Sequence, residues 1–244
     1  MPRFFTPTEN FDGSIVKITG DDARHIARAL RMAVGDEIAV CDMQGREHLC
    51  RLTRIRDEEC ECEIIESKDG HTESPVHITL YMGYPKGDKL EFVIQKAVEL
   101  GASRIVPFES SRCVKRPKGD KIEKQTARLQ RIAEEAAKQC GRARLAEVTQ
   151  PVSFKTAIEE AAGAELALFC YEGDGTRSMK DILKEKETAR SAAIVIGCEG
   201  GFSGDEAASA ISAGLIPTNL GPRILRCETA PIYALSCLSF VYEL

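Results

Sequence analysis

The sequence predicts an α/β protein of two domains, a small β-rich module followed by a larger domain with a mostly parallel sheet. Residues 14–64 contain short runs of alternating apolar and polar residues separated by glycines, a pattern typical of strands with one buried face. From residue 76 onward, apolar runs alternate with helical patterns, which indicates parallel strands covered by helices. Residues 68–75 are polar and turn-rich, and we interpret them as a linker. The expected domains are therefore residues 1–72 and 73–244.

The first domain is expected to contain strands and one helix. The expected strands are residues 14–18, 37–41, 48–52 and 60–64. A helix is predicted at residues 21–32, capped by Asp21 or Asp22, with Ile26 and Leu30 directed to the core. Its basic residues recur at helical spacing and form one stripe that could hold phosphates or simply be solvated: Arg24, Arg28 and Arg31.

The second domain is expected to alternate strands with helices along its whole length. The predicted strands are residues 77–83, 104–108, 166–171 and 192–197, followed by a short strand that reaches Leu220. The predicted helices are residues 88–100, 120–139, 153–162, a short one that begins at Ser178, 203–214 and 231–242. Ser203 and Glu206 have the spacing of a capping box, and Gly101 closes the first of these helices.

The composition is that of an ordinary globular protein. The 244 residues are 43% hydrophobic and 29% charged, and no apolar run approaches the roughly 18 residues that span a bilayer. The first residues lack the apolar core of a signal peptide, so we expect a cytoplasmic protein that does not enter a membrane. Ten cysteines are spread over the chain without a C-x-x-C pair, which favours reduced thiols over a zinc site. No metal is expected.

A basic block interrupts the acidic chain, whose net charge is −5. Residues 112–144 contain eleven Lys or Arg and four Asp or Glu, a local balance of +7. Such a block could contact the phosphates of a nucleic acid, or it could be a solvated helix face with a basic loop.

Two glycine-rich loops, residues 197–203 and 220–230, are the most informative feature of the sequence. Each follows an apolar run and precedes a helical pattern, which is where parallel sheets bind ligands. The loops do not fit the lysine-containing phosphate loop, the G-x-G-x-x-G fingerprint or the G-x-S-x-G motif of serine hydrolases. All four histidines precede residue 78, which argues against histidine chemistry at the loops.

The reactive side chains that remain at the loops are carboxylates, guanidinium groups and one hydroxyl: Glu199, Arg223, Arg226, Glu228 and Thr229. Carboxylates can accept a proton, and guanidinium groups can hold an oxyanion or a phosphate. An alternative stays open, in which Arg223 and Glu228 form an ion pair and the glycines only make tight turns.

These loops carry a resemblance to a known family. The motifs are G-x-E-G-G-F-S at residues 197–203 and L-G-x-R-I-L-R-x-E-T-A at 220–230. Further matches are residues 1–5, 25–31, 35–36, Lys86, Glu91, 94–101, 110–114, 135–136, Gln139 and 141–142. Over almost its whole length the chain resembles the small-subunit (16S) ribosomal RNA uridine-N3 methyltransferases of the SPOUT, or trefoil-knotted, superfamily.

The resemblance implies a PUA-like N-terminal β-barrel that holds RNA and a knotted α/β domain that binds S-adenosylmethionine. It also implies a homodimer whose substrate is 16S ribosomal RNA or the small ribosomal subunit. The glycine loops would form the cofactor cleft, with residues 168–170 at its floor. The cofactor contacts so implied are Leu168, Phe169, Cys170, Ile196, Gly197, Gly200, Gly201, Leu220, Gly221, Ile224, Leu225 and Thr229.

Methylation of uridine N3 requires removal of a proton while negative charge spreads to the base oxygens. Under the resemblance, Arg226 stabilises that charge or orients the base, and Glu228 or Glu199 accepts the proton or holds the arginine. The implied RNA contacts are Arg24, Arg28, Arg31, Lys86, Lys96, Arg112, Arg142 and Arg223.

Two residues depart from the family pattern. Cys198 stands where the family usually has proline, so this loop loses a fixed φ angle, and modification of the thiol could block the cleft. Ser111 stands where glutamate is common, which leaves the pairing of Arg112 open. The alternatives to the family reading are a non-catalytic RNA-binding or ribosome-assembly factor and a knotted methyltransferase that acts on another RNA or at a ribose 2′-hydroxyl.

Overall fold

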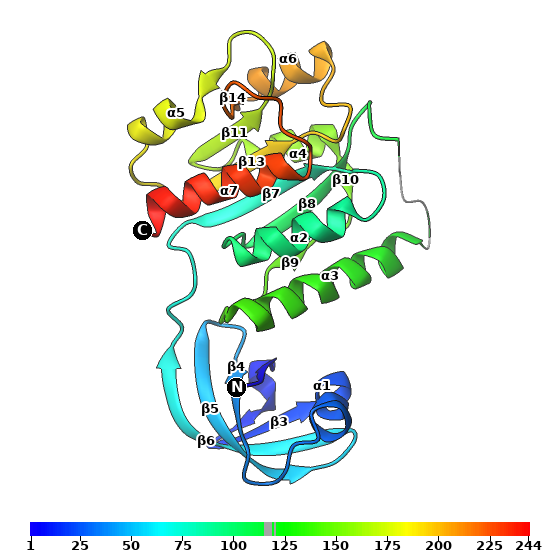
Figure 1. The fold of residues 1–244 in the computed structure, drawn as a ribbon, viewed down its shortest axis with the longest axis vertical. Helices are drawn as coiled ribbons and strands as arrows, with labels where there is room; N and C mark the ends of the chain where they lie inside the picture. The colour runs from blue at the N-terminus through cyan, green and yellow to red at the C-terminus, as the bar shows by residue number, and fades with distance from the viewer. Residues whose placement is uncertain (115–118, 120) are drawn as a thin grey trace. The chain divides into compact units, whose positions relative to one another are not determined.

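Two compact units make up the chain. The computed structural model describes residues 1–114, 119 and 121–244 (Figure 1). The first unit comprises Met1–Glu73 and Ala137–Leu145, and the second comprises Ser74–Ala136 and Ala146–Leu244. The segment 137–145 therefore belongs to the first unit although it lies far along the sequence, and nothing in the local pattern indicates this.

The first unit is built on one curled sheet, as the alternating runs predict. In spatial order its strands are β1 (Arg3–Phe5), β4 (Glu37–Cys41), β5 (Arg46–Ile55), β6 (Glu59–Asp69), β3 (Ile15–Thr19) and β2 (Phe11–Asp12). Only β1 and β4 pair in parallel. A short helical turn, η1 (Thr8–Asn10), precedes β2. The inward side chains form a core that includes the thiols of Cys50, Cys60 and Cys62.

The helix of the first unit is shorter and less regular than predicted. An α-helical turn, α1 (Gly20–Arg24), continues as a π-helical turn, η2 (His25–Ala29), and Arg31 then has a φ of 52°. Thr19 occupies the N-cap position without a side-chain hydrogen bond, so the predicted aspartate cap is wrong. Ile26 is buried as predicted, whereas Leu30 is 39% exposed. A wider turn and an early end break the 3.6-residue spacing, so Arg31 lies beyond the helical turns that carry Arg24 and Arg28.

The second unit contains the mostly parallel sheet that the sequence predicts. Its spatial order is β10 (Val152–Ser153), β8 (Arg104–Glu109), β7 (His77–Gly83), β13 (Ser191–Ile196), β11 (Leu166–Cys170), β14 (Ile216–Asn219) and β12 (Arg177–Ser178), with β9 (Glu147–Val148) beside β8. Every pairing in this sheet is parallel. The knot that the resemblance implies stays a prediction.

Helices cover both faces of this sheet. They are α2 (Lys89–Glu99), α3 (Lys121–Cys140, whose last residues belong to the first unit), α4 (Phe154–Ala161), α5 (Met179–Glu185), α6 (Gly204–Ser212) and α7 (Thr229–Tyr242). The core on one face joins α4 and α6 to alternate residues of the central strands. Figure 1 shows α2 and α7 side by side in front of the sheet. Ser203 and Glu206 form the predicted capping box at the start of α6. Within the described part of the chain, no helix has the length and apolar character needed to cross a membrane.

Candidate active site in the second unit

A cavity of about 890 Å³ lies where three neighbouring parallel strands end. The loops after β13, β11 and β14 line it, together with Lys89 and Arg112. Because the three strands are parallel, their carboxyl ends meet at one edge of the sheet and their loops converge there. The volume falls within the range of small-molecule sites. Both glycine loops of the sequence analysis are therefore parts of one cavity.

Most of the predicted cofactor contacts line this cavity. They are Cys170, Ile196, Gly197, Gly200, Gly201, Leu220, Gly221, Ile224 and Leu225. Leu168 and Phe169 are fully buried and lie outside the lining, and Phe169 instead packs against the ring of Phe202. Thr229 is exposed at the start of α7 and also lies outside the lining.

The first glycine loop is too tight for side chains at two positions. A Cβ added at Gly197 would lie 3.1 Å from the Phe202 ring, and one at Gly200 would lie 2.8 Å from the Cβ of Arg112. Gly201 has a φ of 62°, which disfavours other residues. The loop therefore presents bare backbone to the cavity, as a closely approaching ligand requires.

Sequence reasoning missed one wall of the cavity and one charge. The missed wall is the loop after β11 with the end of β14: Tyr171, Glu172, Gly173, Thr176, Thr218 and Asn219. The rule that ligands bind beyond the ends of parallel strands could have found this loop, because it follows a predicted strand. The missed charge is Lys89, at the start of α2, which no motif indicates.

Lys89 connects the two glycine loops. Its Nζ lies 3.2 Å from Oε1 of Glu199 in the first loop and 3.1 Å from Oε2 of Glu228 in the second. The Lys86 N–H also donates to Glu199, at 3.0 Å. The alternative in which Arg223 pairs with Glu228 is not observed, because Lys89 is the partner of that carboxylate.

Both carboxylates are held in the charged form. Partial burial alone would raise the pKa of Glu199, but hydrogen bonds from backbone N–H groups and from Lys89 outweigh it and lower the pKa. The pKa of Glu228 is lowered in the same way, with Cys227 and Lys89 as side-chain donors. The pKa of Lys89 is raised by Glu228 and then by Glu199. The three groups form a cluster in which one ammonium lies between two carboxylates, and each charge favours the charged form of its neighbour.

The two arginines of the second loop are exposed at the cavity. Arg223 and Arg226 both line it. The backbone carbonyl of Arg226 accepts hydrogen bonds from the N–H groups of Thr229 and Ala230, which anchors this loop to the start of α7. Within the described residues neither guanidinium has an ion pair, so both are available to an anionic ligand.

Arg112 is bound to the first glycine loop. Its Nη1 donates to the carbonyl of Gly200 at 2.9 Å. The N–H of Ser111 donates to Oε1 of Glu206, at 2.7 Å. The departure at Ser111 therefore leaves Arg112 held by the backbone of the loop, and the capping glutamate of α6 binds the main chain beside it.

Several predicted RNA contacts already have acidic partners. In the first unit Arg24 pairs with Asp21, and Arg28 pairs with Asp57. In the second unit Lys96 pairs with Glu99, at 2.8 Å. Arg31 and Lys86 are exposed. The basic residues 115, 116 and 118 of the basic block lie outside the described residues.

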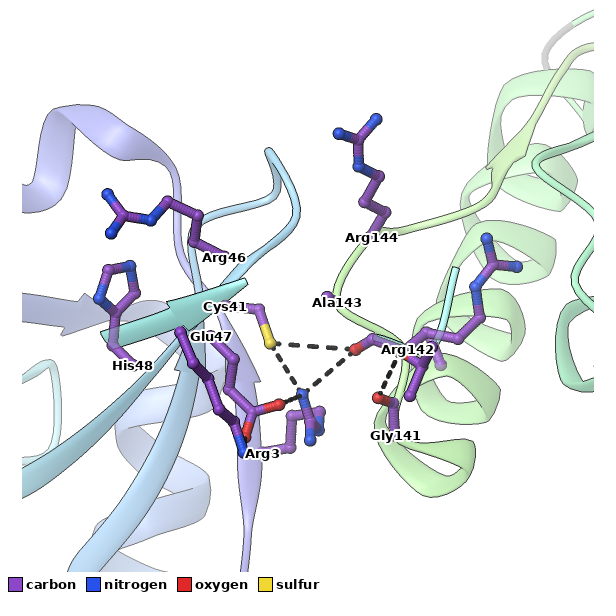
Figure 2. A network of polar contacts seen from close by, with 12 residues as sticks. Arg3, Cys41, Arg46, Glu47, His48, Gly141, Arg142, Ala143 and Arg144 are labelled. Carbon is purple, nitrogen blue, oxygen red and sulfur yellow. Dashed lines mark hydrogen bonds and ion pairs between the residues drawn. The ribbon is translucent and has the colours of Figure 1, made fainter. Parts of the chain in front are cut away.

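Arg142 is a structural anchor of the first unit. Only 4% of the residue is exposed, and its guanidinium lies 2.6 Å from Oε2 of Glu73. Its carbonyl accepts from Arg3, which pairs with Glu47 and contacts Cys41 (Figure 2). A buried, paired guanidinium cannot reach phosphates, so we reassign Arg142 from RNA contact to the packing of segment 137–145.

Family models match both parts of the chain. The model described as an RNA methyltransferase domain matches residues 72–239. The model described as an RNA methyltransferase PUA domain matches residues 18–65.

Individual relatives match over nearly the full length. The ribosomal RNA small subunit methyltransferase E of Bacillus subtilis is 34% identical, with 100% of this chain and 98% of the relative covered. The solved structure of the Neisseria gonorrhoeae enzyme of that name, bound to S-adenosyl methionine, is 31% identical with a TM-score of 0.89, covering 99% of this chain and 98% of that one. A Legionella pneumophila putative methyltransferase in complex with the cofactor is 30% identical with a TM-score of 0.88, covering 98% and 96%.

The Lys89 bridge predicts a pH-dependent contribution to stability. The folded pKa values of Glu199 and Glu228 lie below the ordinary value of 4.5, so their stabilisation is present above that pH and is lost as the pH falls through the folded values. Lys89→Met should therefore lower the free energy of unfolding at pH 7, and the difference from the wild type should disappear well below pH 4.5, where the carboxylates are protonated. Urea denaturation at pH 7 and at that acidic pH measures the difference, with Lys96→Met as the control on the same helix. Equal destabilisation at both pH values would indicate lost packing instead.

The Arg142–Glu73 pair predicts a large effect of a single truncation. Arg142→Ala removes the guanidinium that pairs with the Glu73 carboxylate, which should cost about 3 kcal/mol of unfolding free energy. Thermal and urea denaturation measure this. Arg144→Ala is the matched control, because Arg144 is exposed and its guanidinium donates to the uncharged Gln44 carbonyl, at 2.8 Å. Equal losses of unfolding free energy in the two variants would show that the Arg142–Glu73 pair does not anchor segment 137–145.

Proposed function

The chain belongs to the ribosomal RNA small subunit methyltransferase E family of RNA methyltransferases, and on this premise we propose that it transfers a methyl group from S-adenosylmethionine to N3 of a uridine in 16S ribosomal RNA. One observation carries the proposal: both glycine loops line a single cavity together with Arg226 and Glu228. The loops that would bind the cofactor and the pair Arg226 and Glu228 therefore line the same cavity.

The cavity suits S-adenosylmethionine in shape and charge. Bare backbone at Gly197, Gly200 and Gly201 permits close approach of a flat base, and Cys170 and Ile196 add apolar surface. The carboxylates at the cavity favour the positive sulfonium and ammonium groups: Glu172, Glu199 and Glu228. When bound, the cofactor supplies an electrophilic methyl group. No lysine-containing phosphate loop is needed, because the ligand carries no phosphate.

We assign the chemical roles to the second glycine loop. The exposed guanidinium of Arg226 would stabilise the negative charge that spreads to the uracil oxygens as N3 loses its proton. Glu228 is two residues away and would accept that proton. Glu199 is a weaker candidate, because both of its oxygens receive the Lys86 N–H in addition to the Lys89 contact that it shares with Glu228. Lys89 is then a positioning residue that keeps Glu228 charged and oriented.

We propose that residues 1–72 form the PUA-like RNA-binding domain and residues 73–244 the SPOUT methyltransferase domain. Exposed basic side chains would contact RNA phosphates, with Arg31, Lys86 and Arg223 as the strongest candidates. Arg24, Arg28, Lys96 and Arg112 would have to exchange their present partners for phosphates. Binding should therefore weaken as salt is added. Ribosomal RNA as substrate supports a cytoplasmic location.

A homodimer is part of the proposal. Exposed apolar side chains gather on the last helix, α7, where Tyr233 is 44%, Val241 39% and Phe240 71% exposed. Apolar surface of this kind on one helix is typical of a contact with another protein chain.

Incubation of the protein with S-adenosylmethionine and unmodified small subunits or 16S rRNA should produce N3-methyluridine, measured by mass spectrometry. Arg226→Ala should retain cofactor binding by calorimetry and lose roughly 100-fold or more in turnover, the scale of a lost charge-stabilising donor. Arg190→Ala, an exposed arginine paired with Glu165 outside the cavity lining, is the control and should behave as wild type.

Two results would contradict the proposal. Cofactor binding without any N3-methyluridine would favour a non-catalytic RNA-binding factor or another methylation site. Loss of cofactor binding in Arg226→Ala would show that this arginine holds the cofactor and does not act on the base.

A further inference from the structure

Two loops of the second unit are docked against each other beside the cavity. The loop after β8, residues 110–114, contacts the first glycine loop, residues 197–203, and the start of α6. Arg112 donates to the Gly200 carbonyl at 2.9 Å, and the Ser111 N–H donates to Glu206 at 2.7 Å. These contacts hold the two loops together beside a small buried cluster.

The cluster consists of two thiols around one hydroxyl. Ser110 Oγ lies 3.2 Å from Sγ of Cys113 and 4.0 Å from Sγ of Cys198. The Ser110 N–H also donates to Cys113 Sγ, at 3.4 Å. Cys113 is 6% exposed and Cys198 5% exposed. Two sulfur atoms that share one hydroxyl oxygen, on loops already in contact, are close neighbours.

We propose that Cys113 and Cys198 form an oxidation site, in which a peroxide joins the two thiols as a reversible disulfide that closes the cofactor cavity. The consequence for cofactor binding rests on the proposed function, whereas formation of the disulfide does not.

The chemical environment divides the two sulfurs into a nucleophile and a resolving thiol. Hydrogen bonding from Cys198, with further hydrogen bonds from Ser110, outweighs burial and lowers the pKa of Cys113 to about 6. The pKa of Cys198 is raised by that same hydrogen bond and by burial. At neutral pH the pair therefore holds one proton, with Cys113 as the thiolate that reacts with oxidants.

The reaction balances with hydrogen peroxide as the oxidant. The Cys113 thiolate attacks one peroxide oxygen, the O–O bond breaks, and hydroxide leaves, so the sulfur becomes a sulfenic acid by a two-electron oxidation. Cys198 sulfur then attacks the Cys113 sulfur, an S–S bond forms, and the S–O bond breaks. The departing hydroxyl takes the Cys198 proton and leaves as water.

Formation of the bond must alter the cavity. Cys198 lines the cavity between Gly197 and Glu199. A disulfide requires sulfur atoms about 2.05 Å apart, so the two side chains must move toward each other. The main chain of Cys198 packs closely against Gly83, because a Cβ added at Gly83 would lie 2.6 Å from the Cys198 nitrogen. Movement of Cys198 toward Cys113 would therefore disturb the packing of the glycine loop that would hold the cofactor.

Two further thiols provide an internal comparison. Cys170 and Cys227 also line the cavity, but burial raises the pKa of each thiol to about 12. Both therefore stay protonated at neutral pH and react slowly with peroxide. We therefore expect peroxide to oxidise Cys113 and Cys198 before Cys170 and Cys227.

The test treats the full-length protein with hydrogen peroxide, digests it without reduction and identifies linked peptides by mass spectrometry. A Cys113–Cys198 link should form in the wild type, disappear with dithiothreitol, and be absent from Cys113→Ser and Cys198→Ser. Cys227→Ser is the matched control and should still form it. If circular dichroism shows that a serine variant does not fold, the alanine variant at the same position, Cys113→Ala or Cys198→Ala, is used in its place.

Calorimetry with S-adenosylmethionine then tests the consequence. Oxidised wild type should bind at least tenfold more weakly, dithiothreitol should restore the affinity, and Cys113→Ser should be insensitive to peroxide. Links between other cysteines, or sulfinic acid at Cys198 without a link, would overturn the oxidation site. A link that leaves the affinity unchanged would overturn closure of the cavity. If the reduced protein does not bind S-adenosylmethionine, the proposed function fails. The peptide digest still shows whether the Cys113–Cys198 disulfide forms.

Discussion

Parallel pairing of β13, β11 and β14 is the constraint on which the site depends. Phe169 of β11 lies opposite Val195 of β13, and Cys170 lies opposite Thr218 of β14, so the three strands end at nearly the same level. Loops far apart in the sequence must then leave the sheet at one edge. Because helices cover both faces, that edge is the place where backbone can stay uncovered and meet a ligand.

A lysine between two carboxylates holds the two glycine loops together. Two carboxylates from separate loops approach each other at the cavity, an arrangement that would be repulsive without a cation. Lys89 comes from a third element, α2, and places its ammonium within 3.2 Å of Glu199 and 3.1 Å of Glu228. The last residues of the second loop, 226–230, are then fixed by this bridge and by the hydrogen bonds at the start of α7, which leaves Arg226 exposed on a defined backbone.

The accuracy of the sequence interpretation follows the range of the interactions involved. The capping box of Ser203 and Glu206 was predicted correctly because both partners lie within one helical turn. The helix predicted at residues 21–32 was too long, because it widens and ends after Ala29, so Arg31 lies outside it. Arg142 resembled a phosphate contact in a basic block, yet it is buried against Glu73, a residue 69 positions away.

The sequence by itself determined the α/β class, the order of the longer strands and of the helices, the glycine loops and their family, because periodicity, caps and turn residues are local signals. Tertiary structure alone decided that segment 137–145 joins the first unit, that Lys89 bridges the two loops, and that Cys113 lies beside Cys198. Each of these depends on groups that meet only after the chain has folded, and their distances along the chain carry no pattern that a sequence could show.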